Sequence, residues 1–239
     1  MASLAQPNAT PDGEARFFAR YTLILALFIL FAFLQFALRG MSTYVFDYVW
    51  PHVHGGLMVT WLAVMVMQTR LVEQGDLARH RKLGWIGAYL VVGVVVSGCM
   101  AGVLALKAGV VPPFFTKAYF LALTIVGSVV FGGLVFAAIT RRKQTDYHRR
   151  LMFGSLVAIT EPAFGRVLPM PLMIGWGEWV VLAIQLAMLG VVALHDRKTI
   201  GRIHPATATA GAIIAMTHVL VELSAINPDI IAFADRLAG

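Results

Sequence analysis

Long runs of apolar residues alternate along the chain with short polar connections. A bilayer core about 30 Å thick requires roughly 20 apolar residues in a helix, because each residue rises about 1.5 Å. Such runs predict an all-α, polytopic integral membrane bundle of seven transmembrane helices. The predicted spans are Tyr21–Leu38, His54–Thr69, Leu83–Leu106, Thr116–Thr140, Leu151–Leu168, Glu178–Leu194 and Ala206–Leu223.

The segments outside these spans are short and rich in turn-forming residues, such as "VPPF" and "LPMPLMIGWG". We expect residues 1–20 to form a flexible cytoplasmic segment, residues 21–226 the transmembrane domain, and residues 227–239 a short periplasmic tail. The first apolar run is as long as a full span and no small-residue cleavage motif follows it. A cleaved signal peptide is therefore not expected.

The composition agrees with a membrane protein. The chain is 59% hydrophobic and only 13% charged, whereas a soluble domain carries about 25% charged residues. The formal charge of +7 does not indicate a nucleic-acid partner, because the basic residues form short clusters between apolar runs. The single cysteine, Cys99, excludes an intrachain disulfide.

Lysine and arginine are concentrated in alternate connections, which is the pattern of cytoplasmic loops. We therefore expect a cytoplasmic N-terminus, a periplasmic C-terminus and a location in a bacterial inner membrane. The basic-rich segments contain Arg16 and Arg20; Arg70, Arg79, Arg81 and Lys82; Arg141, Arg142, Lys143, Arg149 and Arg150; and Arg197, Lys198 and Arg202.

Two of these segments resemble each other. "DLARHRKLGW" precedes the third span and "TDYHRRLMFG" precedes the fifth, and each has an acid, then His-Arg, a second basic residue and a leucine at the helix entry. Such residues suit the lipid headgroup layer, which favours a simple anchoring role. The alternative is a pair of duplicated hairpins whose histidines, His80 and His148, bind a group at the inner face.

Ionisable residues inside the spans are the strongest indication of function, because they are costly in lipid and usually face the bundle interior. The helical rise places Glu161, His218, Glu222 and His54 about 17, 20, 26 and 24 Å above the inner face, respectively. The polar residues Gln35 and Ser97 fall near the same height. The sequence therefore predicts a polar layer in the outer half of the membrane.

Small residues one and two turns away from Glu161 and His218 predict that both side chains point at neighbouring helices. Pro162 lacks a backbone donor and is expected to bend the fifth span, where freed carbonyls require partners. At "WPHVHGGLMVTW", we expect His54 to face inward, in line with Met58 and Trp61. His52 would reach the same centre only from an irregular entry turn.

The first interpretation of this layer is a metal centre. Imidazoles and carboxylates from separate helices hold zinc or iron in many helical bundles. The predicted ligands are His54, Glu161, His218 and His52, and the predicted catalytic residues are Glu222 and Glu161. The function would be that of a metal-dependent enzyme acting on a hydrophobic or lipid-like substrate.

The second interpretation is haem b. Two histidines on facing helices can ligate haem, and glycine-rich faces leave room for the macrocycle. His54 with His218 would serve an outer haem, and His80 with His148 would serve an inner one. A further inner pair is His195 with His204. The protein would then pass electrons to a partner across the membrane.

The third interpretation is structural. The polar groups would hydrogen-bond one another within a transporter, a sensor or an accessory subunit, as a homo-oligomer or in a larger membrane complex. In this class a Glu161–His218 pair could relay protons. Two other acids are expected to have no functional role. Glu178 lies in the first turn of a span, where the helix dipole favours an acid. Asp196 is expected to be a solvated loop residue.

The second to fifth spans resemble a bacterial family of multi-pass inner-membrane proteins defined by a domain of unknown function. The resemblance implies a fold and no chemistry. The general plan is also similar to two-haem transmembrane b-type cytochromes and to seven-span zinc hydrolases of ceramide-like lipids, although Glu222 departs from the closely spaced histidines of the latter. The family resemblance is carried by His54, His80, Arg81, Gly84, Tyr89, Ser97, Asp146, His148, Arg149 and Arg166.

Overall fold

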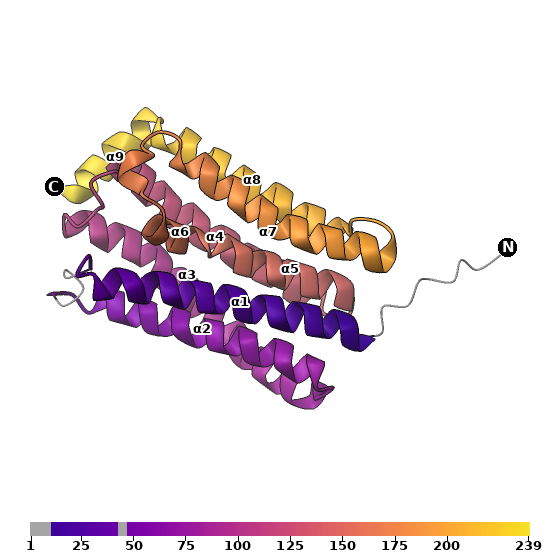
Figure 1. Ribbon diagram of the computed structural model, residues 1–239. Helices are drawn as coiled ribbons and strands as arrows, with labels where there is room; N and C mark the ends of the chain where they lie inside the picture. The colour runs from indigo at the N-terminus through magenta and orange to yellow at the C-terminus, as the bar shows by residue number, and fades with distance from the viewer. Residues whose placement is uncertain (1–10, 43–46) are drawn as a thin grey trace.

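The computed structural model describes residues 11–42 and 47–239, which contain helices and no strand. Six long helices lie side by side in an elongated bundle (Figure 1). They are α1 (Pro11–Leu38), α2 (Trp50–Glu73), α3 (Leu77–Lys107), α4 (Lys117–Thr140), α7 (Gly177–Ile200) and α8 (Pro205–Ala225). The shorter elements are α5 (Thr145–Ala158), α6 (Glu161–Val167), the 3₁₀ turn η2 (Met170–Leu172) and α9 (Pro228–Ala238).

The six long helices are each long and apolar enough to cross a membrane. Large apolar side chains also cover the outside of the bundle: Ile24, Phe31, Val92 and Phe136 are all more than half exposed. Because a soluble protein rarely exposes so continuous an apolar surface, the fold indicates a multi-pass membrane protein.

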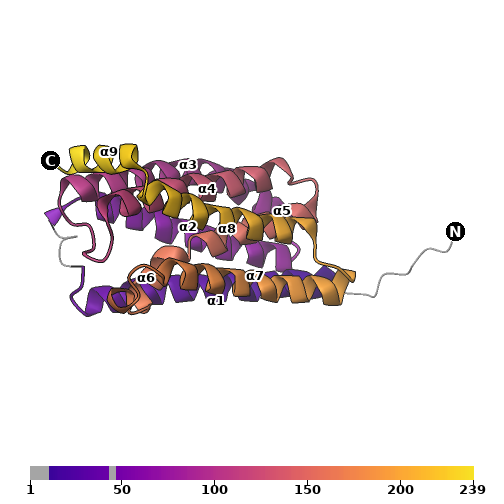
Figure 2. The same ribbon diagram turned by 90° about the horizontal axis from the view of Figure 1, so that it is seen from above.

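The two ends of the bundle differ in charge. The α2–α3, α4–α5 and α7–α8 connections lie at the end where α1 begins, whereas α9 lies at the opposite end (Figures 1 and 2). We call these the basic end and the α9 end. The basic end carries Arg79, Arg81, Lys82, Arg141, Arg142, Lys143, Arg149, Arg150, Arg197, Lys198 and Arg202.

The predicted fifth span, Leu151–Leu168, is not one continuous helix. α5 ends at Ala158 and α6 begins at Glu161, so the chain breaks just before Pro162. The break leaves the carbonyls of Val157 and Ala158 near the side chain of Gln185 on α7, whose Nε2 donates to them at 3.1 and 3.2 Å. α6 continues toward the α9 end (Figure 1). The bend expected at the proline is thus a break, and its carbonyls accept from Gln185 on another helix and, at Val157, also from the backbone N–H and hydroxyl of Thr160 at 3.0 and 2.6 Å.

Both predicted terminal segments contain helix. α1 begins at Pro11 rather than Tyr21, and residues 1–10 lie outside the described part of the chain. The extra turns are held by Glu14, whose carboxylate lies 2.7 Å from Arg149 and 2.9 Å from Arg150. The predicted tail, residues 227–239, forms α9, which starts after Asn227 because its side chain caps the helix.

The core lies along the axis of the bundle. Trp61 on α2 is 1% exposed and packs edge-to-face on Phe131 of α4 with ring centres 5.3 Å apart. The inward direction predicted for the His54–Met58–Trp61 face of α2 is therefore confirmed at Trp61.

Candidate functional site

The two similar segments at the basic end place their histidines opposite each other. Asp76 caps α3 by accepting from the backbone N–H of Arg79, and His80 lies in the first turn that follows. His148 occupies the same position in the first turn of α5. The two imidazole rings lie with their centres 6.4 Å apart and their planes at 85°. Of the histidine pairs considered for haem, this is one that the structure brings together.

The hydrogen bonds of these rings fix their tautomers. The Nδ1 of His148 lies 2.9 Å from the carbonyl of Ala138, and that of His80 lies 3.4 Å from the carbonyl of Gln68. A carbonyl oxygen only accepts, so each Nδ1 carries the proton. In the neutral rings both Nε2 atoms therefore hold a lone pair, which is the form in which histidine binds a metal.

The neighbouring face of α2 contains two buried polar atoms without a hydrogen-bond partner in the described chain, Gln68 Oε1 and Trp61 Nε1. Both residues face glycines of α3. A Cβ added to Gly84 would lie 3.3 Å from Gln68 Nε2, and one added to Gly87 would lie 3.9 Å from the Trp61 ring. An unpaired acceptor and an unpaired donor are unusual in a protein interior and call for an explanation.

His54 faces α3, as predicted, but its partner is Ser97. Its Nδ1 lies 3.0 Å from Ser97 Oγ, and that hydroxyl donates to the carbonyl of Val94. The hydroxyl therefore accepts from His54, whose Nε2 holds the lone pair. His52 is exposed on the other side of the helix start. The structure thus separates the two histidines of α2.

His218 faces α7 instead. Its Nε2 lies 2.8 Å from Gln185 Oε1, and its Nδ1 lies 2.5 Å from Glu178 Oε1. The second carboxylate oxygen of Glu178 accepts from the hydroxyl of Tyr119 on α4. Gln185 accepts from one ring nitrogen of His218, and Glu178 lies against the other in a close contact that is not aligned as a hydrogen bond. Both nitrogens are therefore covered by side chains of α7, and neither is directed at His54.

The predicted metal centre is accordingly not assembled. In residues 11–42 and 47–239, no three or more His, Cys, Asp or Glu side chains are arranged to hold a metal ion. Glu161 begins α6, and Glu222 lies one turn beyond His218, both partly exposed. His54 and His218 bind different neighbours, and His52 is exposed. A metal-dependent enzyme built on His54, His52, Glu161 and His218 stays a prediction.

The remaining histidine pair, His195 with His204, is also separated. The His195 ring stacks on Phe17 with centres 3.8 Å apart, whereas the His204 ring packs against Tyr147. His204 precedes α8 and caps it, since its Nδ1 accepts from the backbone N–H of Ala206 at 3.1 Å. Neither ring faces the other.

Three polar residues of the outer layer were not predicted as functional. Glu178 is only 5% exposed, so it is a buried network acid rather than a simple first-turn acid. Tyr119 accompanies it as a direct partner and Gln185 as an indirect one through His218, and both lie within apolar runs of the sequence. The available signal was the polarity of Gln185 in the middle of a span, since such a group requires partners in lipid.

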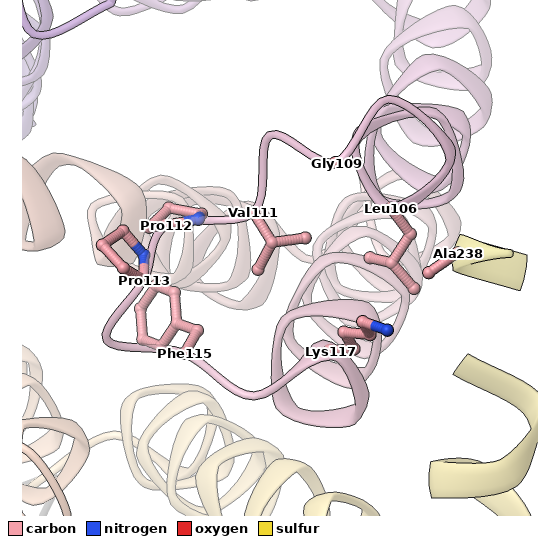
Figure 3. Close-up of a pocket in the computed structure, with 8 residues that line it drawn as sticks. All are labelled: Leu106, Gly109, Val111, Pro112, Pro113, Phe115, Lys117 and Ala238. Carbon is pink, nitrogen blue, oxygen red and sulfur yellow. The ribbon is translucent and has the colours of Figure 1, made fainter. Parts of the chain in front are cut away.

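A cavity of about 410 Å³ lies at the α9 end, between the α3–α4 connection and the end of α9 (Figure 3). Its lining is mostly apolar, and Lys117 is its one charged residue. Lys117 also pairs with Asp235 of α9 at 3.2 Å. Its lining residues are Leu106, Gly109, Val111, Pro112, Pro113, Phe115, Lys117 and Ala238.

No protein-family model, curated protein or solved structure matches the chain.

Proposed function

We propose that the protein is a membrane electron carrier that binds a b-type haem between His80 and His148. The observation that carries this proposal is the proximity of these two rings, which come from different helices and lie with their centres 6.4 Å apart. Of the three interpretations of the sequence, haem binding is the one whose ligands lie together.

The spacing of the rings supports shared ligation. A metal ion bound by two imidazole nitrogens at about 2 Å each holds the ring centres about 6 Å apart. The observed separation is 6.4 Å. The two Nδ1–H groups donate to backbone carbonyls, which would orient the rings and leave both Nε2 atoms free to coordinate.

The residues around His80 and His148 also suit haem, which has carboxylates at one edge. Gly84 and Gly87 follow His80 by one and two turns, and side chains of α2 pack against both glycines. Gln68 Oε1 and Trp61 Nε1 would offer an acceptor and a donor to a bound group. Arg81 and Arg149 lie within electrostatic range of the two rings and are suited to carboxylates such as haem propionates.

Bound haem would supply one-electron redox chemistry near the membrane surface. The residues of the chain would hold the iron by two neutral nitrogens and place the cofactor edge beside the basic end. An electron-transfer partner at that face and a second partner in the membrane are the predicted contacts. A second haem at His54 is not proposed, because His218 is bound to Glu178 and Gln185.

We also propose that α5 and α6 together cross the membrane once, between α4 and α7, which gives seven crossings in total. The membrane would be a bacterial inner membrane, with the basic end in the cytoplasm. This is supported by α1 beginning and α9 ending at opposite ends of the bundle (Figure 1). The concentration of Lys and Arg at the basic end gives the direction.

The test is the absorption spectrum of the full chain, purified in detergent from cells supplied with a haem precursor. We expect a Soret band that shifts on dithionite reduction and a low-spin signal from two nitrogen ligands in electron paramagnetic resonance. His80→Ala and His148→Ala should each lose these signals, while His52→Ala, an exposed histidine, keeps them. No Soret band in the folded wild type, or a band lost in His54→Ala and kept in His80→Ala, would overturn the assignment.

A further inference from the structure

A second cluster of titratable side chains lies in the α9 half of the bundle, away from His80 and His148. It joins three helices, with Tyr119 from α4, Glu178 and Gln185 from α7, and His218 from α8. Glu178 and His218 are 5% and 3% exposed. A buried carboxylate beside an imidazole in a membrane span is costly unless its protons are arranged to neutralise it.

The hydrogen bonds determine where one proton of His218 lies. Gln185 Nε2 donates to the carbonyls of Val157 and Ala158, which fixes the orientation of the amide. Gln185 Oε1 is therefore the atom that faces His218, and it can only accept. The Nε2 of His218 consequently carries a proton that Gln185 holds in place.

A second proton must lie on the other side of the ring. His218 Nδ1 and Glu178 Oε1 are 2.5 Å apart, a distance that two lone pairs would not tolerate. The contact is too close for two lone pairs but is not aligned as a hydrogen bond, so one of the two groups holds a proton, either the imidazole or the carboxyl. With that proton the pair is neutral overall, and without it the pair carries one negative charge that the hydroxyl of Tyr119 stabilises by donation.

The groups around this pair favour proton exchange. Glu161 from α6 and Glu222 from α8 both interact electrostatically with Glu178, and Glu161 also interacts with Arg166. Neighbouring carboxylates disfavour one another's ionised form, so their proximity favours a proton in the cluster.

The route to water leads toward the α9 end. Glu222 is partly exposed one turn beyond His218. Phe115 lines the cavity at the α9 end, and its ring stacks on Tyr119 with centres 5.0 Å apart (Figure 3). On the opposite side, Phe153, Leu189 and Val192 belong to the buried apolar core. Access is therefore expected from one side.

We infer that Glu178 and His218 form a proton-binding site that exchanges a single proton with the aqueous phase at the α9 end. The inference goes beyond electron transfer and does not depend on it. Removal of the proton places the charge on Glu178, and the released proton leaves past Glu222 or Tyr119. No other reactant is involved.

The test is infrared difference spectroscopy of the full chain in lipid nanodiscs, stepped between about pH 5 and pH 9. We expect carboxyl and imidazole bands that titrate together in the wild type. Glu178→Gln should lose both, and His218→Gln should uncouple the carboxyl band from any imidazole change. Glu73→Gln, which alters an acid of the basic end, serves as the matched control and should leave the bands unchanged.

A milder variant guards against loss of the fold. Tyr119→Phe keeps the carboxylate and the imidazole but removes a donor to Glu178, so both bands should persist while the carboxyl band changes its frequency. Bands that are the same in Glu178→Gln as in the wild type, or that ignore Tyr119→Phe, would overturn the inference. So would proton flow across sealed vesicles that Glu178→Gln abolishes, since it would show access from both sides. The Soret band of the same samples reports on the haem proposal separately.

Discussion

Arg150 and Asp196 form a buried ion pair at the basic end, between α5 and α7. Arg150 Nη2 lies 2.6 Å from Asp196 Oδ1, and the two side chains are 1% and 0% exposed. Asp196 Oδ2 accepts from the hydroxyl of Thr207 and from the backbone N–H of His204, while Glu14 binds Arg150 from α1. The acid predicted as a solvated loop residue is instead the centre of a network that joins α1, α5, α7 and α8, because α7 continues to Ile200.

Removal of the acid alone should destabilise the protein strongly. Asp196→Ala leaves the Arg150 guanidinium buried with less compensation, and such a change costs about 3–5 kcal/mol. Thermal or denaturant unfolding in detergent measures it. Asp47→Ala, at an exposed acid, should stay within about 0.5 kcal/mol of the wild type. The double variant Arg150→Met/Asp196→Leu should recover most of the loss, and an equal stability of Asp196→Ala and Asp47→Ala would contradict the network's role.

His204 should make stability depend on pH. It lies between α7 and α8, and burial together with Arg150 lowers its pKa below the ordinary value. The folded state therefore favours the neutral ring, whose Nδ1 caps α8. Its contribution is complete above the unfolded pKa of about 6.5 and is lost as the pH falls below that value.

The matched variant for this prediction is His204→Asn, which keeps a capping acceptor but does not titrate. Unfolding measured across this pH range should show a smaller loss of stability on acidification in the variant than in the wild type. Parallel curves for the two proteins would show that His204 is not the responsible group.

The sequence predicted the membrane class because composition and run length suffice for it. Six of the seven predicted spans correspond to long apolar helices, with ends that differ by several residues. The remaining predicted span, Leu151–Leu168, is interrupted between α5 and α6. Pro162 lacks a backbone donor, and Gln185, which donates to the freed carbonyls, lies on α7. The sequence around Pro162 does not indicate this contact with α7.

The height of a residue in the membrane predicted its contacts less well than the similarity of two helix starts did. His80 and His148 were paired from two similar helix starts, and their placement in the first turn of α3 and α5 follows from that similarity. His54, Glu161 and His218 were grouped by height alone, which leaves the rotation of each helix undetermined. The small-residue stripe before Glu161 does contact another helix at Gly154, where an added Cβ would lie 2.6 Å from Ala210 Cβ, whereas a Cβ on Gly165 would meet no neighbour within 4 Å.

Gln185 should be essential to the break between α5 and α6. Gln185→Leu removes the donor to the carbonyls of Val157 and Ala158 and the acceptor for His218, and one buried group left unpaired costs about 1–3 kcal/mol. We expect at least that loss in unfolding experiments. Gln144→Leu, at an exposed position before α5, is the control and should have little effect. Equal stability of the two variants would mean that the break is satisfied in another way.

Chemical labelling of single cysteines decides whether α5 and α6 cross the membrane. After replacement of Cys99 by alanine, cysteines are placed at Lys143, before α5, and at Leu172, after α6; both positions are exposed. A maleimide that does not cross membranes, added to intact bacterial spheroplasts, should label the Leu172→Cys protein at once. It should label Lys143→Cys only after permeabilisation, because the basic end is expected in the cytoplasm.

Arg202→Cys should behave like Lys143→Cys, and Arg236→Cys like Leu172→Cys. If Lys143→Cys and Leu172→Cys share one side, the broken helix turns back within the membrane and six helices cross it; if all four are reversed, the assignment of the basic end to the cytoplasm is wrong.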